Sequence, residues 1–402
     1  MAAIVLHGDC IVVMRSMLES SIDVIVTDPP YGLEFMGKEW DSFGRQHPYK
    51  ARTEEGYGDK GILLHYGRGG TSKDREHFRR KANINAQAWH ETWAREALRV
   101  LKPGGHLLAF GGTRTYHRLT CALEDAGFEI RDCLMWLYGS GFPKSHSVPA
   151  ALDRLLLGKG PRGHAIATAG TIQASTGKLL PPGGNIPAYE AESDTAKQWS
   201  GWGTALKPAW EPIILARKPL SEPNVAANVL RHGTGALNID ASRIVGAPDP
   251  ASWTAKRTVI NTSDGRIGQK AANIAAMNAG LIAPPSGRWP ANVLLDVEAA
   301  RLLDEQIGDA KGASRFFYCA KASQAERTMN GRVENSHPTV KPLALMRYLI
   351  QLITPPGALV LDPFAGSGST LVAAESIGIS AIGIEQDSDS VRTTTARLLA
   401  TR

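Results

Sequence analysis

Hydrophobic positions in the first 140 residues alternate between short apolar runs and a helical spacing. Apart from Asp23, the run at 22–26 is β-branched and apolar, which predicts a short buried strand. Apolar residues then recur at helical intervals, so we expect a helix over about 86–101, ended by a Pro-Gly-Gly sequence. Further apolar runs at 106–110 and 133–138 flank a helical segment near 114–126. This alternation predicts an α/β fold, with a parallel sheet covered by helices on both faces.

The pattern weakens in the middle of the chain. Residues 139–206 are rich in Gly, Pro, Ser and Thr and contain few apolar runs, which predicts a flexible insertion over 141–206. A buried strand is expected next, within 207–218. From 219 to 335 the periodicity is poor. So long an irregular stretch is unusual inside a compact domain, and it suggests a functional insertion.

Regular periodicity returns close to the C-terminus. A helix is expected to end at residue 354, and an apolar strand then leads into the stretch DPFAGSGST at 362–370. Glycines in that stretch let the backbone turn tightly and approach a ligand, and a serine or threonine can cap the following helix. The next strand ends in Glu385, which follows Gly368 by 17 residues. That separation is close to the spacing at which an acid reaches a ribose.

The strand at 22–26 runs into a second unusual stretch, Asp28-Pro29-Pro30-Tyr31. Neither proline can donate a hydrogen bond to a neighbouring strand, and each fixes its own φ. Asp28 is held near extended geometry because it precedes a proline. The strand end is therefore stiff and carries a carboxylate, a free proline carbonyl and an aromatic ring. These groups predict the wall of a pocket.

Composition narrows the class of protein. The 402 residues are 43% hydrophobic and 21% charged, which is typical of globular proteins. We find no membrane-length apolar run and no secretory signal, and the four cysteines form no metal-binding spacing or disulfide framework. A reduced, cytoplasmic protein without a bound metal is expected. The net charge of +6 fits an anionic partner such as nucleic acid without requiring one.

The glycine-rich stretch predicts a nucleoside cofactor. The phosphate-loop signature is absent, and the dinucleotide fingerprint is incomplete because Leu371 stands where its third glycine would be. Asp362 at the strand tip would repel a pyrophosphate, but it suits a ligand that carries an ammonium and a sulfonium. We therefore expect S-adenosylmethionine.

Together the stretches DPPY and DPFAGSGS resemble those of the DNA amino-methyltransferases. DPPY comes first and the glycine loop near the C-terminus, an order that resembles the circularly permuted β class. The stretches HGD at 7–9 and HPTVKP at 337–342 support the resemblance, which covers about 1–140, 207–218 and 335–402. It implies a Rossmann-like, S-adenosylmethionine-dependent methyltransferase sheet with helices on both faces, circularly permuted, with an inserted target-recognition region.

On this basis the chain divides into five segments with separate roles. They are a catalytic half at 1–140 that includes a DNA-closing loop at 32–82, the flexible insertion at 141–206, a sheet strand at 207–218, a target-recognition region at 219–335 and a cofactor-binding half at 336–402.

An exocyclic amine is a poor nucleophile because its lone pair is delocalised into the base. Asp28 can accept one of its N–H groups and the Pro29 carbonyl the other, with the backbone stiffened by Pro30. Tyr31 offers a ring for stacking, worth about 1–3 kcal/mol per base. These four residues are the predicted catalytic set. A base inside a duplex must be flipped out to reach them.

The resemblance implies roles for the cofactor-binding residues. Asp9 would hold the adenine amino group, Glu385 the ribose and the glycine loop the methionine end, with Asp362 and Lys341 on the methionine ammonium and carboxylate. Open alternatives are a helix cap for Asp9, an adenine contact for Asp387 and a solvated Lys341. The full set is Asp9, Lys341, Asp362, Phe364, Gly366, Ser367, Gly368, Ser369, Glu385 and Asp387.

The expected substrate is a flipped adenine in double-stranded DNA, because DPPY with Asp resembles the adenine-modifying members. Methylation of the cytosine 4-amino group is the alternative, and a DNA-binding module with an idle methyltransferase fold is an alternative from another class. A homodimer stays open. Candidate DNA contacts are Arg75, Arg79, Arg80, Lys81, Arg231, Arg243, Arg257, Arg266 and Arg288.

Overall fold

The structure is a computed structural model. It describes residues 3–31, 72–139, 145–158, 189–244, 287–307, 314, 317–320, 326, 328–335 and 340–401, with backbone only for 72–85 and 318–320. The chain forms two compact units, one comprising 1–136 with 211–402 and the other 137–210. Within the described ranges, none of the helices is both long enough and apolar enough to span a membrane.

The larger unit holds the strands, together with helices that precede or follow them. Its strands are β1 (Ala3–His7), β2 (Ile22–Thr27), β3 (Leu101–Phe110), β4 (Glu129–Leu137), β5 (Trp210–Arg217), β6 (Val293–Asp296), β7 (Tyr318–Ala320), β8 (Leu359–Asp362) and β9 (Ser380–Glu385). Its helices are α1 (Cys10–Ser16), α2 (Ser72–Val100), α3 (Tyr116–Ala126), α6 (Val225–His232), α9 (Val297–Ile307), α11 (Leu343–Ile353), α12 (Ser369–Ser376) and α13 (Ser388–Thr401).

These strands form one sheet in the order β1-β9-β8-β2-β3-β5-β4-β6-β7. The run from β1 to β3 is parallel, as the alternating pattern predicted. β5 differs, because it pairs antiparallel with β3, so the sheet is mixed. A strand parallel to its neighbour needs a connection that crosses over the sheet. β5 instead begins where the chain returns from the unit at 137–210. β6 and β7, from the predicted target-recognition region, extend the same sheet.

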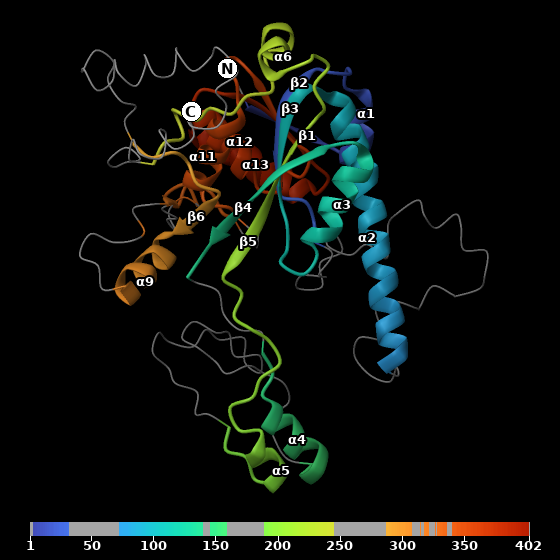
Figure 1. The fold of residues 1–402 in the computed structure, drawn as a ribbon, viewed down its shortest axis with the longest axis vertical. Coiled ribbons are helices and arrows are strands. Elements are labelled where there is room, and N and C mark those ends of the chain that lie inside the picture. Colours follow the sequence, from blue (N-terminus) through green and yellow to red (C-terminus); the bar gives the residue numbers. More distant parts are fainter. Residues whose placement is uncertain are drawn as a thin grey trace, which may run out of the picture. The chain divides into compact units, whose positions relative to one another are not determined.

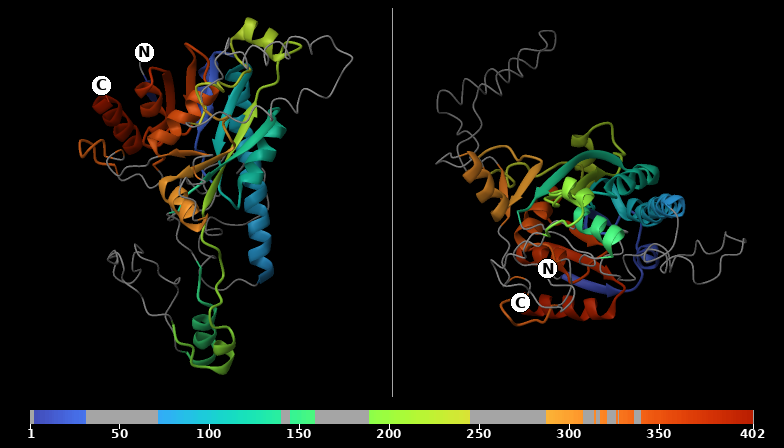
Figure 2. Two further views of the ribbon diagram at one scale, coloured as in Figure 1. Left: turned by 60° about the vertical axis from the view of Figure 1, so that its left-hand side comes forward. Right: turned by 90° about the horizontal axis from the view of Figure 1, so that it is seen from below.

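Helices cover both faces of the sheet, which confirms the predicted layers (Figure 1). On one face Met14 of α1, Trp93 of α2 and Leu123 of α3 are buried in a single core. On the other face Met346 of α11 and Leu371 of α12 are buried in a second core. Figure 2 shows the same division from two further directions, with α11–α13 on the side opposite to α1–α3.

The helix predicted at 86–101 begins earlier than expected. α2 starts at Ser72, so residues 72–82 of the predicted DNA-closing loop are helical and only 32–71 lie outside the described residues. The added turns are rich in charged and polar residues and lack an apolar stripe. The spacing of apolar residues therefore could not predict them. α6 and α9 likewise occur inside the stretch expected to be irregular.

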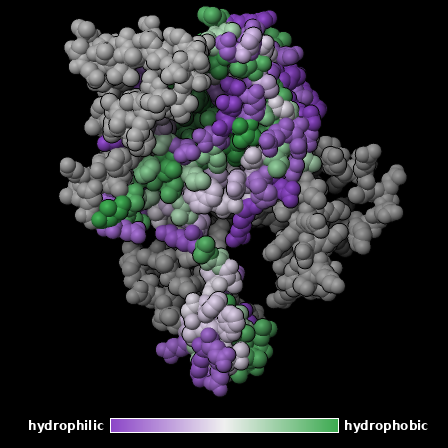
Figure 3. Space-filling view, in the orientation of Figure 1, coloured by the Kyte–Doolittle hydropathy of each residue, from purple (hydrophilic) through white to green (hydrophobic). Residues whose placement is uncertain are grey.

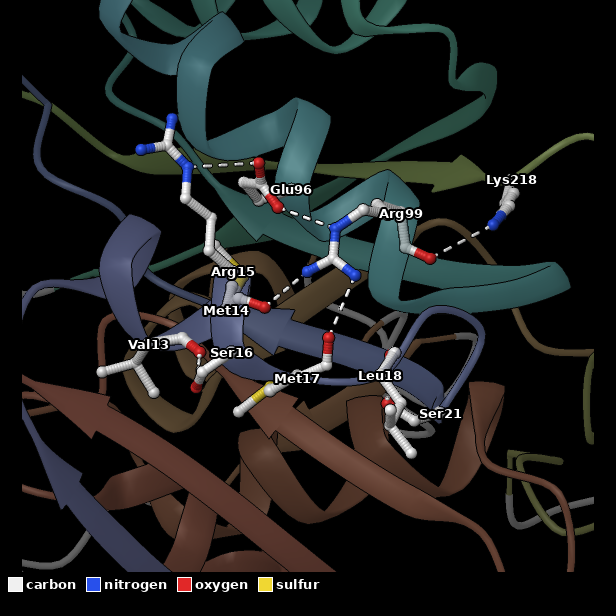
Figure 4. Close-up of polar contacts among 10 residues, drawn as sticks. All are labelled: Val13, Met14, Arg15, Ser16, Met17, Leu18, Ser21, Glu96, Arg99 and Lys218. Atoms are coloured by element: carbon white, nitrogen blue, oxygen red, sulfur yellow. Dashed lines mark hydrogen bonds and ion pairs between the residues drawn. The ribbon is translucent and has the colours of Figure 1, made fainter.

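Arg99 near the end of α2 fixes the end of α1 (Figure 4). Its guanidinium donates to the carbonyls of Met14 at 2.6 Å and Met17 at 3.0 Å. Glu96 accepts from Arg99 Nε at 2.9 Å and also from Arg15 at 3.4 Å. The Met14 carbonyl also accepts from Met17 N at 2.9 Å, so Arg99 adds a second donor there and supplies one to the Met17 carbonyl beyond the helix end.

The smaller unit has its own buried polar centre. Asp153, in α4 (Val148–Leu157), is fully buried and accepts hydrogen bonds from the Tyr189 hydroxyl at 2.9 Å and from Glu192 N at 2.7 Å. Ser193, which caps α5 (Asp194–Gln198), donates its backbone N–H to Asp153 at 3.0 Å. Hydrophobic side chains gather over α4 (Figure 3), where Leu155 is 82% exposed. Part of the predicted insertion is therefore regularly folded.

Candidate active site

The two motifs meet at one edge of the sheet, where parallel strands end. β2 ends next to Asp28, β8 ends in Asp362, and β9 ends in Glu385. β8 lies between β2 and β9, and β1 pairs with β9 so that His7 is opposite Glu385. Ligands of open α/β sheets bind outside the carboxyl ends of the strands. The sheet therefore brings DPPY and the glycine loop to one such edge.

Asp362 lies beneath the glycine loop. It is 2% exposed, and its Oδ1 accepts from Thr27 Oγ1 at 2.7 Å and from Phe364 N at 3.1 Å, while Oδ2 accepts from Thr370 Oγ1 at 2.5 Å. Burial raises the pKa of Asp362 to about 6, although these hydrogen bonds oppose the shift. A carboxylate expected to meet a ligand ammonium should face the pocket. This one instead anchors the loop to β2.

The glycine loop takes a left-handed conformation at Gly366 and Gly368, where φ is 52° and 80°. Thr394 Oγ1 donates to the Gly366 carbonyl at 2.9 Å, and Arg397 Nη1 donates to the Ser367 carbonyl at 2.6 Å. A Cβ on Gly368 would approach Thr394 Cγ2 to 2.5 Å. Only glycine fits there, because the turn and the close approach of α13 both exclude a side chain.

Arg397 is a residue of this site that the sequence did not reveal. It is fully buried in α13, and burial lowers the pKa of Arg397 to about 10, against the opposing charge of Glu326. Its Nη1 also lies 3.3 Å from the hydroxyls of Ser367 and Ser369. An arginine in a helix carries no local signal of burial, so only the packing of α13 behind the loop identifies it.

The carboxylates expected on the cofactor side are largely engaged with backbone. Asp9 caps α1 and accepts from Ile11 N at 2.9 Å and Val12 N at 3.1 Å, which is the helix-cap alternative. Glu385 accepts from Gly366 N at 2.7 Å and from Asp387 N at 2.8 Å, and burial raises its pKa. Asp387 in turn accepts from the first turn of the following helix α13. The acids thus hold the loops at the strand ends in fixed positions.

Phe364 lies between the glycine loop and α2. Its ring centroid is 5.7 Å from that of Trp89 and 5.4 Å from that of Trp93, in tilted and edge-on arrangements. Next to them His90 is buried, which lowers its pKa to about 3, so its imidazole is neutral. The aromatic contacts fix the position of Phe364 at the start of the loop.

The DPPY side forms a charged cluster. Tyr31 Oη donates to Asp28 Oδ1 at 2.7 Å, and Lys341 Nζ lies 3.2 Å from Asp28 Oδ2. Lys341 Nζ also donates to Glu211 Oε2 at 2.7 Å and lies 3.3 Å from Tyr31 Oη. Desolvation alone would lower the pKa of Lys341, but the charges of Asp28 and Glu211 outweigh it and raise the pKa. The ammonium therefore stays protonated.

Aromatic rings surround the ammonium of Lys341. It lies 4.6 Å from the ring centroid of Phe110, 5.7 Å from that of Tyr31 and 6.0 Å from that of Trp136. Sequence reasoning placed Lys341 on the cofactor carboxylate or in solvent. In the structure its side chain is 9% exposed and belongs to the DPPY cluster. Glu211 was not predicted, because it is 130 residues from Lys341 and has no local motif.

The predicted DNA contacts are only partly described. Arg231 pairs with Glu222 at 2.5 Å, and Arg243 pairs with Asp240 at 2.8 Å while lying 5.5 Å from the ring of Trp289. The Arg288 backbone bridges to Ile244, close to Arg243. Outside the described residues lie Arg257 and Arg266, together with the side chains of Arg75, Arg79, Arg80 and Lys81. Across the described ranges, no cluster of His, Cys, Asp and Glu could hold a metal ion.

The chain belongs to the DNA methylases of the N6 and N4 type, because the model of that family matches residues 22–396. This match confirms the resemblance to the DNA amino-methyltransferases inferred from the two motifs. The chain is 24% identical over 388 residues to the type II methyltransferase M.HindIII of Haemophilus influenzae, which covers 95% of this chain and 90% of that protein. A putative methylase of Escherichia coli, YubD, is 59% identical over 49 residues, 12% of this chain and 22% of that one.

Two solved structures resemble the fold. The PvuII DNA methyltransferase, described as cytosine-N4-specific, aligns with 99% of this chain and 86% of its own at 14% identity, with a TM-score of 0.47. A putative DNA modification methylase from Thermus thermophilus aligns with 99% of this chain and 94% of its own at 15% identity, with a TM-score of 0.42. The family assignment rests on the sequence match.

Proposed function

We propose that this DNA methyltransferase is site-specific and methylates the exocyclic 6-amino group of a flipped adenine in double-stranded DNA. The observation that carries the proposal is the hydrogen bond from Thr27 to Asp362, which joins the strand of DPPY to the strand of the glycine loop. A wall that accepts an amino group is thereby fixed next to a loop suited to a nucleoside ligand.

S-adenosylmethionine is the cofactor, and it supplies the methyl group from its sulfonium. The residues of the glycine loop fit it, because the left-handed turns at Gly366 and Gly368 let the backbone turn tightly after β8, with α13 packed against Gly368. We propose that this loop holds the methionine end, with Ser367 and Ser369 beside it. Glu385 ends β9, the strand next to β8, and Asp9 follows β1, the strand next to β9; we propose that they contact the ribose and the adenine.

The DPPY cluster can orient the target amine. Asp28 accepts one N–H and the Pro29 carbonyl accepts the other, so that the nitrogen lone pair is directed at the donor methyl. Tyr31 stacks on the base, and its hydroxyl holds Asp28 in place. As the methyl group is transferred, the nitrogen becomes positively charged, and the Asp28 carboxylate stabilises that charge before the proton leaves.

The choice of adenine rests on the Asp of DPPY, which resembles the adenine-modifying members. Cytosine is the alternative, because its 4-amino group and adjacent ring nitrogen present the same donor and acceptor pattern to this wall. We propose further that 219–335 recognises the target sequence, that the enzyme acts in the cytoplasm, and that the motif order reflects a circular permutation. A homodimer and an associated restriction enzyme stay open.

Methylated-base analysis of DNA from cells that express the protein tests the proposal. We expect 6-methyladenine with the wild type and none with Asp28→Ala, which lacks the acceptor. A peak of 4-methylcytosine would show that the target base is cytosine and not adenine, and the proposed mechanism would still apply. Tight DNA binding with neither modified base would identify an idle DNA-binding module.

A further inference from the structure

One member of the charged cluster, Glu211, has no role in the chemistry described so far. It stands at the start of β5, the antiparallel strand beside β3. Its Oε2 accepts from Lys341 Nζ at 2.7 Å and lies 3.5 Å from Tyr31 Oη. Because Lys341 also contacts Asp28, a single ammonium joins the carboxylates of Asp28 and Glu211.

The charges of this cluster do not cancel. One buried ammonium faces two carboxylates, so the set of Asp28, Glu211 and Lys341 carries one net negative charge. With Lys341 and Asp28 alone, the ion pair would be neutral and Asp28 would offer little charge to a target nitrogen. Methyl transfer moves a positive charge onto that nitrogen, and preorganised negative charge stabilises the transition state. Glu211 therefore balances Lys341 and leaves the charge of Asp28 available.

Glu211 also fixes geometry. The ammonium of Lys341 is held from one side by Glu211 and from another by the rings of Phe110 and Trp136, so its position does not depend on Asp28. Asp28 in turn accepts from Tyr31 and Lys341 on different oxygens, which sets the plane of its carboxylate. A rotation of that plane would misdirect the acceptor for the target amine, and small misplacements are costly in rate.

We propose that Glu211 is a positioning residue for methyl transfer: through Lys341 it orients Asp28 and keeps the negative charge of Asp28 free for the target amino group. This inference rests on the proposed function. Among the described residues, the charged and titratable groups that face Asp28 are Tyr31 from the same turn, Lys341 from the segment before α11, Glu211 from β5 and Asp362 from β8.

The test compares Glu211→Gln with Glu129→Gln in the full-length chain. Glu129 is a matched control, because it stands on the neighbouring strand β4 and is paired at 2.6 Å with Arg217, outside the cluster. Transfer of tritiated methyl groups from S-adenosylmethionine to unmethylated genomic DNA gives kcat and KM, and calorimetry gives the cofactor Kd. We expect Glu211→Gln to lower kcat by about 100-fold, similar to loss of one preorganised electrostatic group. The cofactor Kd should change less than threefold, about 0.6 kcal/mol, and Glu129→Gln should behave as wild type.

The pH dependence of kcat/KM separates this role from a structural one. Glu211→Gln removes a negative charge near Asp28, so protonation of Asp28 becomes harder and the acid limb should move to lower pH. Lys341→Met removes the positive charge and leaves the carboxylates facing each other, so the acid limb should move to higher pH. Glu211→Asp keeps the charge and should leave the limb unshifted. A residue that only stabilised the fold would not move the limb in opposite directions.

The outcomes are distinct. If the wild type binds S-adenosylmethionine but transfers no methyl group to DNA, the proposed function is wrong and this inference falls with it. If the wild type is active and Glu211→Gln retains kcat within twofold, or if both charge variants move the acid limb the same way, only the role of Glu211 is overturned. If Glu211→Gln does not bind the cofactor, the Glu211→Asp variant is the deciding one. An acid limb of its kcat/KM profile that is shifted from that of the wild type would overturn the proposed role of the Glu211 charge.

Discussion

Thr27 Oγ1 donates a hydrogen bond of 2.7 Å to Asp362 Oδ1, across 335 residues of sequence. The two residues end neighbouring parallel strands, one leading into DPPY and the other into the glycine loop. Their contact fixes the distance between the wall that orients a target amine and the loop proposed to hold the methyl donor. Catalysis by proximity requires such a fixed distance.

Asp362 should make the stability of the protein depend on pH. Folding raises its pKa from 3.8 to about 6, so between these values the folded state binds more protons than the unfolded state. The contribution of this group to the free energy of unfolding therefore falls as pH rises from about 4 to 6. In urea unfolding at several pH values, the stability of the wild type relative to Asp362→Asn should decline over this window and level off above it. If the difference in stability between the two proteins is the same at every pH, the pKa of the Asp362 carboxyl group is not raised by folding.

Gly368→Ala should weaken binding of the cofactor, beyond any effect of the stability that the variant loses. The new Cβ would approach Thr394 to 2.5 Å at a φ of 80°, so the loop must shift. Gly378→Ala is the control, because its φ is 74° but no atom lies within 4 Å of the added Cβ. We expect both to lose about 1 kcal/mol from backbone strain. Calorimetry with S-adenosylmethionine should show a loss of at least about 10-fold, 1.4 kcal/mol, for Gly368→Ala only; equal affinities would contradict the role of the loop.

Tyr31→Phe should separate the hydroxyl from the ring. The hydroxyl donates at 2.7 Å to Asp28, and a hydrogen bond to a charged group is worth about 1.5–3 kcal/mol. We therefore expect kcat to fall about 10-fold, with little change in the KM for DNA. Tyr31→Ala removes the stacking surface too, at about 1–3 kcal/mol, and should raise that KM. Equal KM values for the two variants would argue against stacking on the target base.

Arg99→Met should destabilise the larger unit without affecting the chemistry. The guanidinium donates to the carbonyls of Met14 and Met17 at the end of α1, and the change removes both of these hydrogen bonds (Figure 4). Urea unfolding should show a loss of about 1–3 kcal/mol. Arg15→Met provides the comparison, because Arg15 is 68% exposed and contacts the other carboxylate oxygen of Glu96, so its loss should stay below about 1 kcal/mol. Equal losses would contradict the capping role of Arg99.

The sequence by itself determined the local features of this protein. Two prolines after a β-branched run, and glycines between a strand and a helix, constrain the backbone wherever they occur, so both motifs were recognisable without a structure. The alternation of apolar runs likewise predicted β2, β8 and β9 and the helices on both sheet faces, because burial imposes that periodicity on each element separately. Membership of the DNA methylases followed from the same residues.

The tertiary structure decided what depends on contacts between distant segments. Glu211 and Arg397 joined the site only because β5 and α13 pack against it, and no local pattern marks either residue. Asp362 was predicted as a ligand contact, but it lies beneath the loop because Thr27 and Thr370 hold both of its oxygens. The position of Lys341 has the same origin. A charged side chain takes its role from the charges and donors that the fold places around it, and spacing along the chain does not encode them.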